Sequence, residues 1–573
     1  MAVARLTVSQ PAPAQIAPSN LSDEVELYQR TYRTLLRSSG ETRLRVLEPS
    51  HMAMGSALHP LADSDEIDLG AFIYAVRRLP EAIVRTTIVV MGQEASQFTR
   101  AGIGPLEEWE SVEAAARRRR WYDSGDEILA VLLASESDVD DLVPTLVALQ
   151  IEWNKIRRRM LAAGWPPDEE VSPEACAIAL GGSADDWGRL ADAWGDRFEE
   201  YLQAIADRSK SMRLRMLGGT QIGYQRMTRR WWAPVRAELH ARRLVDAPLY
   251  FVSSNTHAIS NLVTGLARER EAELVAFIEN GDDEDLKEEL ARFRDGRTDG
   301  SWDNFLYFVA REFFDAGGPE LRAKRHEAEV AAGVEHLRST TALRVPAQVI
   351  PLAGLDPARL DRRIGPVDAE RLGRSGAVIV NVDYPLGLAA YNLLREVAID
   401  SAELRGVYVL GKAATLNADV GDVMISSVIH DEHSSTTYWL DNAFTVDDLA
   451  PYLKFGTGLD NQRAVTVKST FLQNRAYLDF YYREAFTVVE MEAGPYCNAV
   501  YEIADSERYP VGEAVNFSKL PIDFGIIHYA SDTPYTQART LGARGLSYYG
   551  LDSTYASSLA ILRRVLRLEG ALQ

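Results

Sequence analysis

The chain has 573 residues, of which 46% are hydrophobic, so it is long enough to form several packed domains. Its 62 basic and 83 acidic residues give a net charge of −21, a field that repels polyanions and disfavours nucleic acid as a partner. No stretch approaches the roughly eighteen uninterrupted apolar residues of a membrane span, so we expect no membrane partner. Cys176 and Cys497 show no pairing pattern, which suits a cytoplasmic protein.

The first three fifths of the chain predict helices. Residues 1–20 are rich in Ala, Pro, Gln and Ser but lack the apolar block of a signal peptide, and we expect a flexible tail. Apolar residues then recur at helical spacing over residues 21–343. The Pro166-Pro167 pair divides this region into a helical domain, 21–165, and a second helical domain or continuation, 166–343.

Three segments of this region stand out. Residues 71–90, with Pro80 in the middle, predict two helices that meet at a turn. The basic run 117–120 follows several acidic residues and is interpreted as a solvated helix face or a partner contact. Residues 251–265 place hydroxyl and amide side chains at the start of an apolar stripe, which indicates either an N-capped helix or a polar pocket.

From Val345 onward, β-branched runs alternate with helical patterns, as is typical of an α/β domain, which we place at residues 344–573. His430 and His433 have a spacing that a metal could use, but they follow a strand and enter a polar stretch. We therefore expect a loop without fixed ligand geometry and no metal. No organic cofactor is expected either.

Two strand ends in this domain carry acidic residues. The apolar run 486–489 predicts a buried strand that ends in Glu490, Met491 and Glu492, and a helix follows. The run 524–530 predicts a second buried strand, which ends in Ser531 and Asp532. Because α/β folds bind ligands at strand ends, these side chains are candidates for one site.

The ordered motifs of residues 345–573 resemble the nucleoside phosphorylase and nucleosidase superfamily. A Glu-Met-Glu strand end and a later Ser-Asp match its sugar and base motifs. The upstream matches follow in the same order: Gly354-Leu355-Asp356-Pro357-Ala358-Arg359, Val378–Val382 with Gly387, Gly411-Lys412-Ala413-Ala414, and Val420-Gly421-Asp422-Val423. The resemblance implies an α/β phosphorylase-like domain with a mixed central sheet flanked by helices. The residue pattern places a large, mostly α-helical region before it.

The resemblance also implies residue roles. Glu492 would accept hydrogen bonds from the ribose hydroxyls, Met491 would pack on the sugar, and Glu490 would support both. Asp532 would protonate or hydrogen-bond the leaving base, and Arg539 or Arg544 could position it. The substrate-binding set would further include Ser531 and Phe471, which falls where the family stacks an aromatic ring on the base.

The resemblance places a phosphate site at Gly354, Arg359, Gly411 and Lys412. Asp356 and Pro357 suit a helix start, where Arg359 and the helix dipole would bind an anion together. Val409 stands where the family's phosphorylases usually have an arginine, and Lys412 where they have a small hydroxyl. Inorganic phosphate as co-substrate and water as nucleophile therefore both remain open.

The sequence thus predicts cleavage of the N-glycosidic bond of a nucleoside or nucleotide, by phosphorolysis or hydrolysis. The alternative is a superfamily member that binds a nucleotide as a sensor or scaffold through its helical region. The partner would be a small-molecule nucleoside or nucleotide. Because oligomers are common in the superfamily, we also expect a homo-oligomer.

Overall fold

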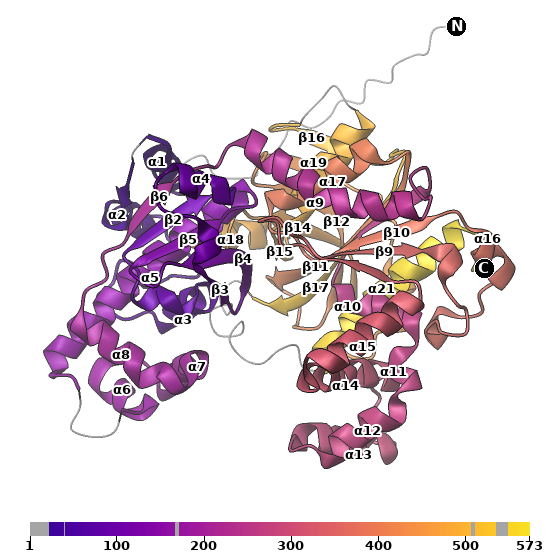
Figure 1. Cartoon of the computed structure of the whole chain (residues 1–573), viewed down its shortest axis with the longest axis horizontal. Coiled ribbons are helices and arrows are strands. Elements are labelled where there is room, and N and C mark those ends of the chain that lie inside the picture. The colour runs from indigo at the N-terminus through magenta and orange to yellow at the C-terminus, as the bar shows by residue number, and fades with distance from the viewer. Residues whose placement is uncertain (1–21, 39, 167–170, 506–509, 534–547, 573) are drawn as a thin grey trace, which may run out of the picture.

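The computed structural model describes residues 22–38, 40–166, 171–505, 510–533 and 548–572. They form two β-sheets with helices packed on their faces (Figure 1). The larger sheet is mixed and is flanked by helices, which confirms the fold predicted for the C-terminal domain. No helix in this part of the chain combines the length and the apolar character needed to cross a membrane.

The smaller sheet lies in the N-terminal half. Its six strands, in spatial order, are β1 (Thr42–Arg43), β6 (Arg213–Met216), β2 (Ile88–Gly92), β5 (Ile128–Leu132), β4 (Arg117–Asp123) and β3 (Glu110–Ala114). The sequence predicted helices here, and for part of residues 71–90 that prediction is wrong. The β-branched run at Ile88 forms a strand because it pairs in parallel with β5 and β6 in the interior of the sheet.

The larger sheet has eleven strands. In spatial order they are β16 (Ala514–Asn516), β13 (Thr436–Trp439), β12 (Val423–Asp431), β14 (Gly458–Thr466), β15 (Val488–Glu490), β11 (Glu403–Thr415), β7 (Pro248–Ser253), β10 (Val378–Val382), β9 (Ala347–Pro351) and β8 (Glu335–Leu337), and β17 (Asp523–Asp532) pairs with β11 and β12. β7 comes from residues before 344, so the sheet draws on the region predicted to be helical. His430 lies in β12 and not in a loop.

Helices complete both halves. In the N-terminal half they are α1 (Ser22–Ser38), α2 (Glu48–Ala53), α3 (Leu69–Arg78), α4 (Ala95–Arg100), α5 (Glu136–Ala163), α6 (Pro173–Leu180), α7 (Ala184–Trp194), α8 (Phe198–Asp207) and α9 (Gln221–Ala241). The others are α10 (Thr256–Thr264), α11 (Leu266–Glu269), α12 (Glu271–Asn280), α13 (Glu284–Arg294), α14 (Trp302–Ala316), α15 (Gly318–Ala331), α16 (Ala369–Arg374), α17 (Leu388–Asp400), α18 (Arg475–Arg483), α19 (Ala493–Ala504) and α21 (Tyr548–Leu568). Asn255 caps α10 through bonds from the backbone N–H groups of His257 and Ala258, which supports the N-capped helix.

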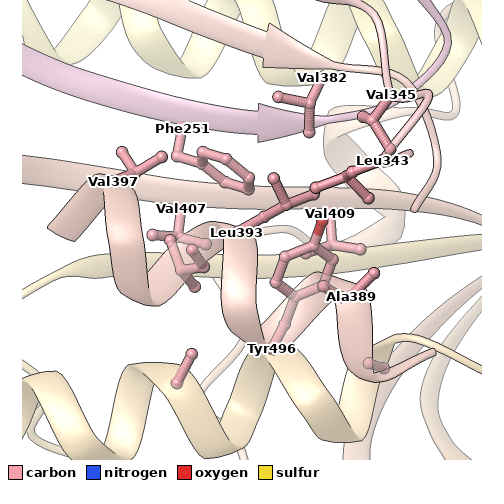
Figure 2. Packing of buried hydrophobic residues seen from close by; sticks show 14 of the residues in the cluster. Phe251, Leu343, Val345, Val382, Ala389, Leu393, Val397, Val407, Val409 and Tyr496 are labelled. Atoms are coloured by element: carbon pink, nitrogen blue, oxygen red, sulfur yellow. The ribbon is translucent and has the colours of Figure 1, made fainter. Parts of the chain in front are cut away.

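Alternating side chains of the central strands fill two separate cores. Phe251, Val407 and Val409 point to the face covered by α9, α17 and α19, where they pack around Tyr496 (Figure 2). Residues between them in sequence, such as Tyr408, belong to the opposite core with α10, α14 and α21. Both faces are therefore largely apolar.

The two halves share one of these cores. Val90, Ala130 and Leu132 of the smaller sheet belong to the same buried cluster as Phe251 of the larger sheet, and Trp231 of α9 packs in it. The opposite face of the smaller sheet packs on α3 and α5. Continuous packing across the halves positions α3, β4 and the start of α5 against the ends of the central strands.

Candidate functional site

A cavity of about 330 Å³ lies between the two halves. One wall comes from the larger sheet and contains the ends of β15 and β17 together with Lys412 of β11. The other wall comes from α3, β4 and the first turn of α5. The volume falls within the range of small-molecule sites.

Five residues predicted from the two strand ends line this cavity together: Glu490, Met491, Glu492, Ser531 and Asp532. The sheet explains why. β11 pairs with β15 on one side and with β17 on the other, and the register aligns Ala414 with both Val489 and Asp532. The Ser531 hydroxyl donates to the carbonyl of Ala413 at 3.1 Å, which ties the end of β17 to β11.

Glu490 supports the start of α19. One carboxylate oxygen accepts hydrogen bonds from the backbone N–H groups of Glu492 and Ala493, both at 2.6 Å. The other accepts from the hydroxyl of Thr466. Burial, with the nearby charge of Glu492, raises the pKa of Glu490 to about 8 despite these bonds. Glu490 therefore binds a proton near neutral pH more readily than an exposed glutamate.

Glu492 is half-buried and more accessible. Its Oε1 accepts from the backbone N–H of Gly387 at 3.3 Å, which fixes the carboxylate at the cavity edge. Burial raises the pKa of Glu492 to about 7, while the Gly387 N–H and the charge of Arg117 oppose that shift. The side chain is thus poised between its two protonation states near neutral pH.

Lys412 brings a positive charge to the same space. Its side chain is exposed to the cavity, but desolvation by the surrounding walls lowers its pKa, the charge of Asp532 raises it, and the charges of Arg78 and Arg117 lower it further. Lys412 is therefore within electrostatic range of residues on both walls. The sequence prediction that placed Lys412 at the site agrees with this position.

The basic run 117–120 lies in strand β4, so its prediction as a helix face is wrong. Arg117 forms a bidentate ion pair with Asp141, at 3.0 Å from Nε and 3.1 Å from Nη2. Arg119 donates to Asp138 and to Asp141, both at 2.7 Å. Burial alone would lower the pKa of Arg117, but the Asp141 carboxylate outweighs it and raises that pKa. Both arginines line the cavity.

The alternate residues of β4 contact the other half of the chain. Arg118 donates to the Asp383 carboxylate at 2.6 Å and to the carbonyl of Tyr384 at 2.7 Å. Arg120 donates to the carbonyl of Ser339 at 3.0 Å. Strand alternation thus sends one pair of arginines toward α5 and the other toward the C-terminal half.

Phe471 does not line the cavity, contrary to its predicted role in stacking on a base. It is buried with Leu58 and Tyr74, and its ring meets that of Tyr74 edge to face at 5.2 Å. Two other aromatic residues line the cavity, Tyr74 of α3 and Tyr384. Phe471 instead packs behind Tyr74 in a buried cluster.

Three residues of the predicted phosphate site lie elsewhere. Gly354 and Arg359 follow β9, which runs antiparallel to β10, so Pro351 at its end lies beside the first residue of β10 and away from the strand ends at the cavity. Arg359 instead pairs with Glu269 at 3.3 Å. Gly411 lies within β11, where a Cβ would approach the ring of His528 to 2.9 Å. Its glycine therefore serves strand packing and not a phosphate turn.

Two further predictions concern metals and a restraining arginine. Among the described residues, His326, Glu329 and His336 offer ligand atoms within 4.8 Å of one another, away from the cavity. Glu329 is already paired there with Arg325 at 2.9 Å. Arg539 and Arg544, predicted as partners for Asp532, lie outside the described residues.

Comparison with known proteins identifies the family. Residues 44–567 match a family described as a family of unknown function, DUF6909. No curated protein matches the chain.

Solved structures with partial similarity include nucleosidases and a phosphorylase. A putative methylthioadenosine nucleosidase from Weissella paramesenteroides is 10% identical, with 56% of this chain and 99% of that chain covered and a TM-score of 0.28. Uridine phosphorylase from Schistosoma mansoni in complex with thymine is 11% identical, with 58% and 91% covered and a TM-score of 0.30. The Neisseria meningitidis 5′-methylthioadenosine/S-adenosylhomocysteine nucleosidase in complex with methylthio-immucillin-A is 14% identical, with 44% and 94% covered and a TM-score of 0.27.

Proposed function

The chain belongs to DUF6909, a family of unknown function, and we propose from the cavity itself that it cleaves the N-glycosidic bond of a nucleoside or nucleotide. One observation supports this proposal above the others. The Glu490-Met491-Glu492 strand end and the Ser531-Asp532 strand end line a single cavity of small-molecule size. The reaction needs a carboxylate at the sugar and an acid at the base, and these two strand ends provide both.

Glu492 would act on the sugar. Cleavage of the bond builds positive charge on the ribose, and a carboxylate beside the ring stabilises that charge. The Gly387 N–H donates to Oε1 of Glu492 at 3.3 Å, and the other carboxylate oxygen would accept from the ribose hydroxyls. A hydroxyl pair that donates to the carboxylate favours the ionised form, so substrate binding would lower the raised pKa of Glu492.

Asp532 would act on the leaving base. Its side chain is 3% exposed and lies at the end of β17, beside Lys412. A carboxyl group in such a position can donate a proton or a hydrogen bond to a base nitrogen as the bond breaks. The attacking group would be water or inorganic phosphate. Assembly into a homo-oligomer remains a prediction from the resemblance.

The test is release of free base. The purified protein is incubated with a panel of nucleosides and nucleoside monophosphates, with and without inorganic phosphate. We expect release from at least one member, and Asp532→Asn should lower kcat about 10² to 10⁴-fold because an amide cannot deliver the proton. Asp441→Asn, at an exposed aspartate outside the cavity, is the control and should keep wild-type turnover. A folded protein that releases no base from any panel member would contradict the proposal.

Glu492→Gln tests the sugar contact separately. The variant should lose about ten- to a hundredfold in kcat/KM, the size of a charge-assisted hydrogen bond. A substrate without the 2′ and 3′ hydroxyls should show a smaller difference between variant and wild type. An equal loss in kcat/KM on both substrates would show that Glu492 does not act through the ribose hydroxyls. Glu484→Gln, at an exposed glutamate outside the cavity, is the matched control.

A further inference from the structure

The wall built by the N-terminal half carries a positive charge that its own carboxylates do not balance. Arg117 and Arg119 have Asp138 and Asp141 as buried partners. Arg78, at the end of α3, also lines the cavity but forms no ion pair with any residue in the described ranges. The imbalance within this wall is therefore located at Arg78.

Arg78 is poorly compensated for so buried a group. Arg78 is only 4% exposed, and its Nε has no hydrogen-bond partner among the described residues. Its Nη1 donates to the carbonyl of Tyr74 at 3.1 Å, and the guanidinium carbon lies 3.3 Å from the centroid of the Tyr74 ring. Burial lowers the pKa of Arg78 to about 10, well short of neutralising it at physiological pH. The Asp141 charge acts on Arg78 only from beyond ion-pair distance, so the buried cation remains costly and an anionic ligand would reduce that cost.

Two neighbouring polar groups are also unsatisfied. The Tyr74 hydroxyl and the Gln473 Oε1 are buried and have no hydrogen-bond partner within the part of the chain that the structure describes, and both residues line the cavity. Tyr74 can donate, and the Gln473 amide can present either its oxygen or, when rotated, its NH₂ group. Buried polar groups normally have partners: the Tyr74 hydroxyl can donate to a ligand oxygen, whereas the Gln473 Oε1 can accept from a ligand hydroxyl.

We propose that Arg78, Tyr74 and Lys412 bind a phosphate monoester carried by the substrate, so that the substrate is a nucleoside monophosphate. This inference rests on the proposed function. Lys412 is near enough to Arg78 for their charges to interact, and it brings a cation from the opposite wall. A guanidinium, an ammonium and a hydroxyl suit the three oxygens of a phosphate ester.

The position of this group favours a substrate phosphate over a free one. A phosphate that attacks the sugar must lie against its anomeric carbon, next to Glu492 and the strand ends. Arg78 and Tyr74 instead belong to the wall that the N-terminal half contributes. A substituent of the sugar can extend from the strand ends to that wall, which is how one ligand would contact both halves of the chain.

The experiment compares matched substrates. Base release is measured from a nucleoside 5′-monophosphate and from the same nucleoside, with wild type, Arg78→Gln and the control Arg359→Gln. Wild type should prefer the nucleotide, and Arg78→Gln should reduce the nucleotide-to-nucleoside ratio of kcat/KM about ten- to a hundredfold. Arg359→Gln should retain the wild-type ratio because Arg359 is outside the cavity. Equal losses on both substrates, or a wild type without preference for the nucleotide, would overturn the inference.

Two further arms complete the test. Calorimetric titration with ribose 5-phosphate and with ribose measures phosphate recognition without catalysis, and Arg78-dependent binding of ribose 5-phosphate would support the subsite even if no base is released. Base release without that binding would leave the proposed function standing and overturn the subsite. If Arg78 instead governs the KM of inorganic phosphate, the bound phosphate is the nucleophile and the inference is wrong. If Arg78→Gln does not fold, Tyr74→Phe, which removes one hydroxyl, should reduce the same ratio severalfold.

Discussion

The two walls of the cavity manage buried charge in different ways. The N-terminal wall pairs Arg117 and Arg119 with Asp138 and Asp141, so most of its charge is balanced inside the wall. The C-terminal wall holds Glu490 and Glu492 with backbone N–H groups and burial, and the pKa values of both carboxyls are raised. Balanced ion pairs favour a fixed structure, whereas carboxyls near their pKa favour proton exchange. A wall of paired charges with one unbalanced cation, Arg78, thus faces the wall to which we assign the proposed chemistry.

The first prediction concerns the buried ion pairs of the N-terminal wall. Arg119→Met should lower the free energy of unfolding by about 3 to 5 kcal/mol, because it leaves the Asp138 carboxylate buried without its partner. Arg197→Met is the control, since Arg197 pairs with Glu200 where both side chains are about half exposed, and it should cost at most about 1 kcal/mol. Urea denaturation of the two variants and the wild type measures both values. Similar losses would show that the N-terminal wall is not held by its buried pairs.

The second prediction sharpens the description of the carboxyl wall. Glu490 has a folded pKa of about 8, above the ordinary value of 4.5, so the folded state binds more protons than the unfolded state between these values. Stability should therefore fall as pH rises from about 4.5 to 8 and level off above that window. Glu490→Gln should remove a part of this fall, on the order of 5 kcal/mol at most, because each pKa unit corresponds to about 1.4 kcal/mol. Urea midpoints across this pH range test it, and identical pH slopes in wild type and variant would contradict it.

Local sequence patterns predicted the residues at the two strand ends but not the residues of the N-terminal wall of the cavity. The apolar runs before Glu490 and Ser531 form the predicted strands, and their acids meet because antiparallel β15 and parallel β17 both pair with the end of β11 at Ala414. Arg78 reaches that edge only through packing between distant parts of the chain, which no local pattern records. A turn at Ser124-Gly125, before the apolar run of β5, was a signal that β4 is a strand of a hairpin and not a helix.

The misplaced phosphate site has a topological reason. Residues 347–351 form the predicted strand β9, but it runs antiparallel to β10, and this direction cannot be derived from the run itself. β7 lies beside β10 in parallel and ends at the same edge. The residues that supply a central parallel strand therefore come from the region predicted to be helical, before the expected start of the domain.

The third prediction concerns the contact between the walls. Gly387 has φ +51°, and a Cβ there would lie 2.3 Å from the Ser137 hydroxyl of α5. Gly387→Ala should destabilise the protein by about 1 to 3 kcal/mol and weaken the support of Glu492. Gly373→Ala, in α16 with nothing within 4 Å of the added methyl, should instead be neutral or slightly stabilising. Adding Ser137→Gly should recover part of the loss in Gly387→Ala; no recovery in melting temperature would mean that the clash is not the cause.

The smallest expected effect is that of Arg359→Gln, which tests the phosphate site that the sequence predicted against the site that the structure supports. Arg359 pairs with Glu269 where the two side chains are 37% and 50% exposed, so the ion pair is screened by solvent. Arg359→Gln should change the free energy of unfolding by no more than about 1 kcal/mol and should leave the affinity for phosphate-bearing ligands within about twofold. Arg78→Gln is the comparison, because Arg78 lines the cavity and Arg359 does not. Calorimetry with ribose 5-phosphate decides between them: a loss in Arg359→Gln equal to that in Arg78→Gln would restore the phosphate site predicted at Gly354 and Arg359, and would show that the wall of the N-terminal half does not bind the anion.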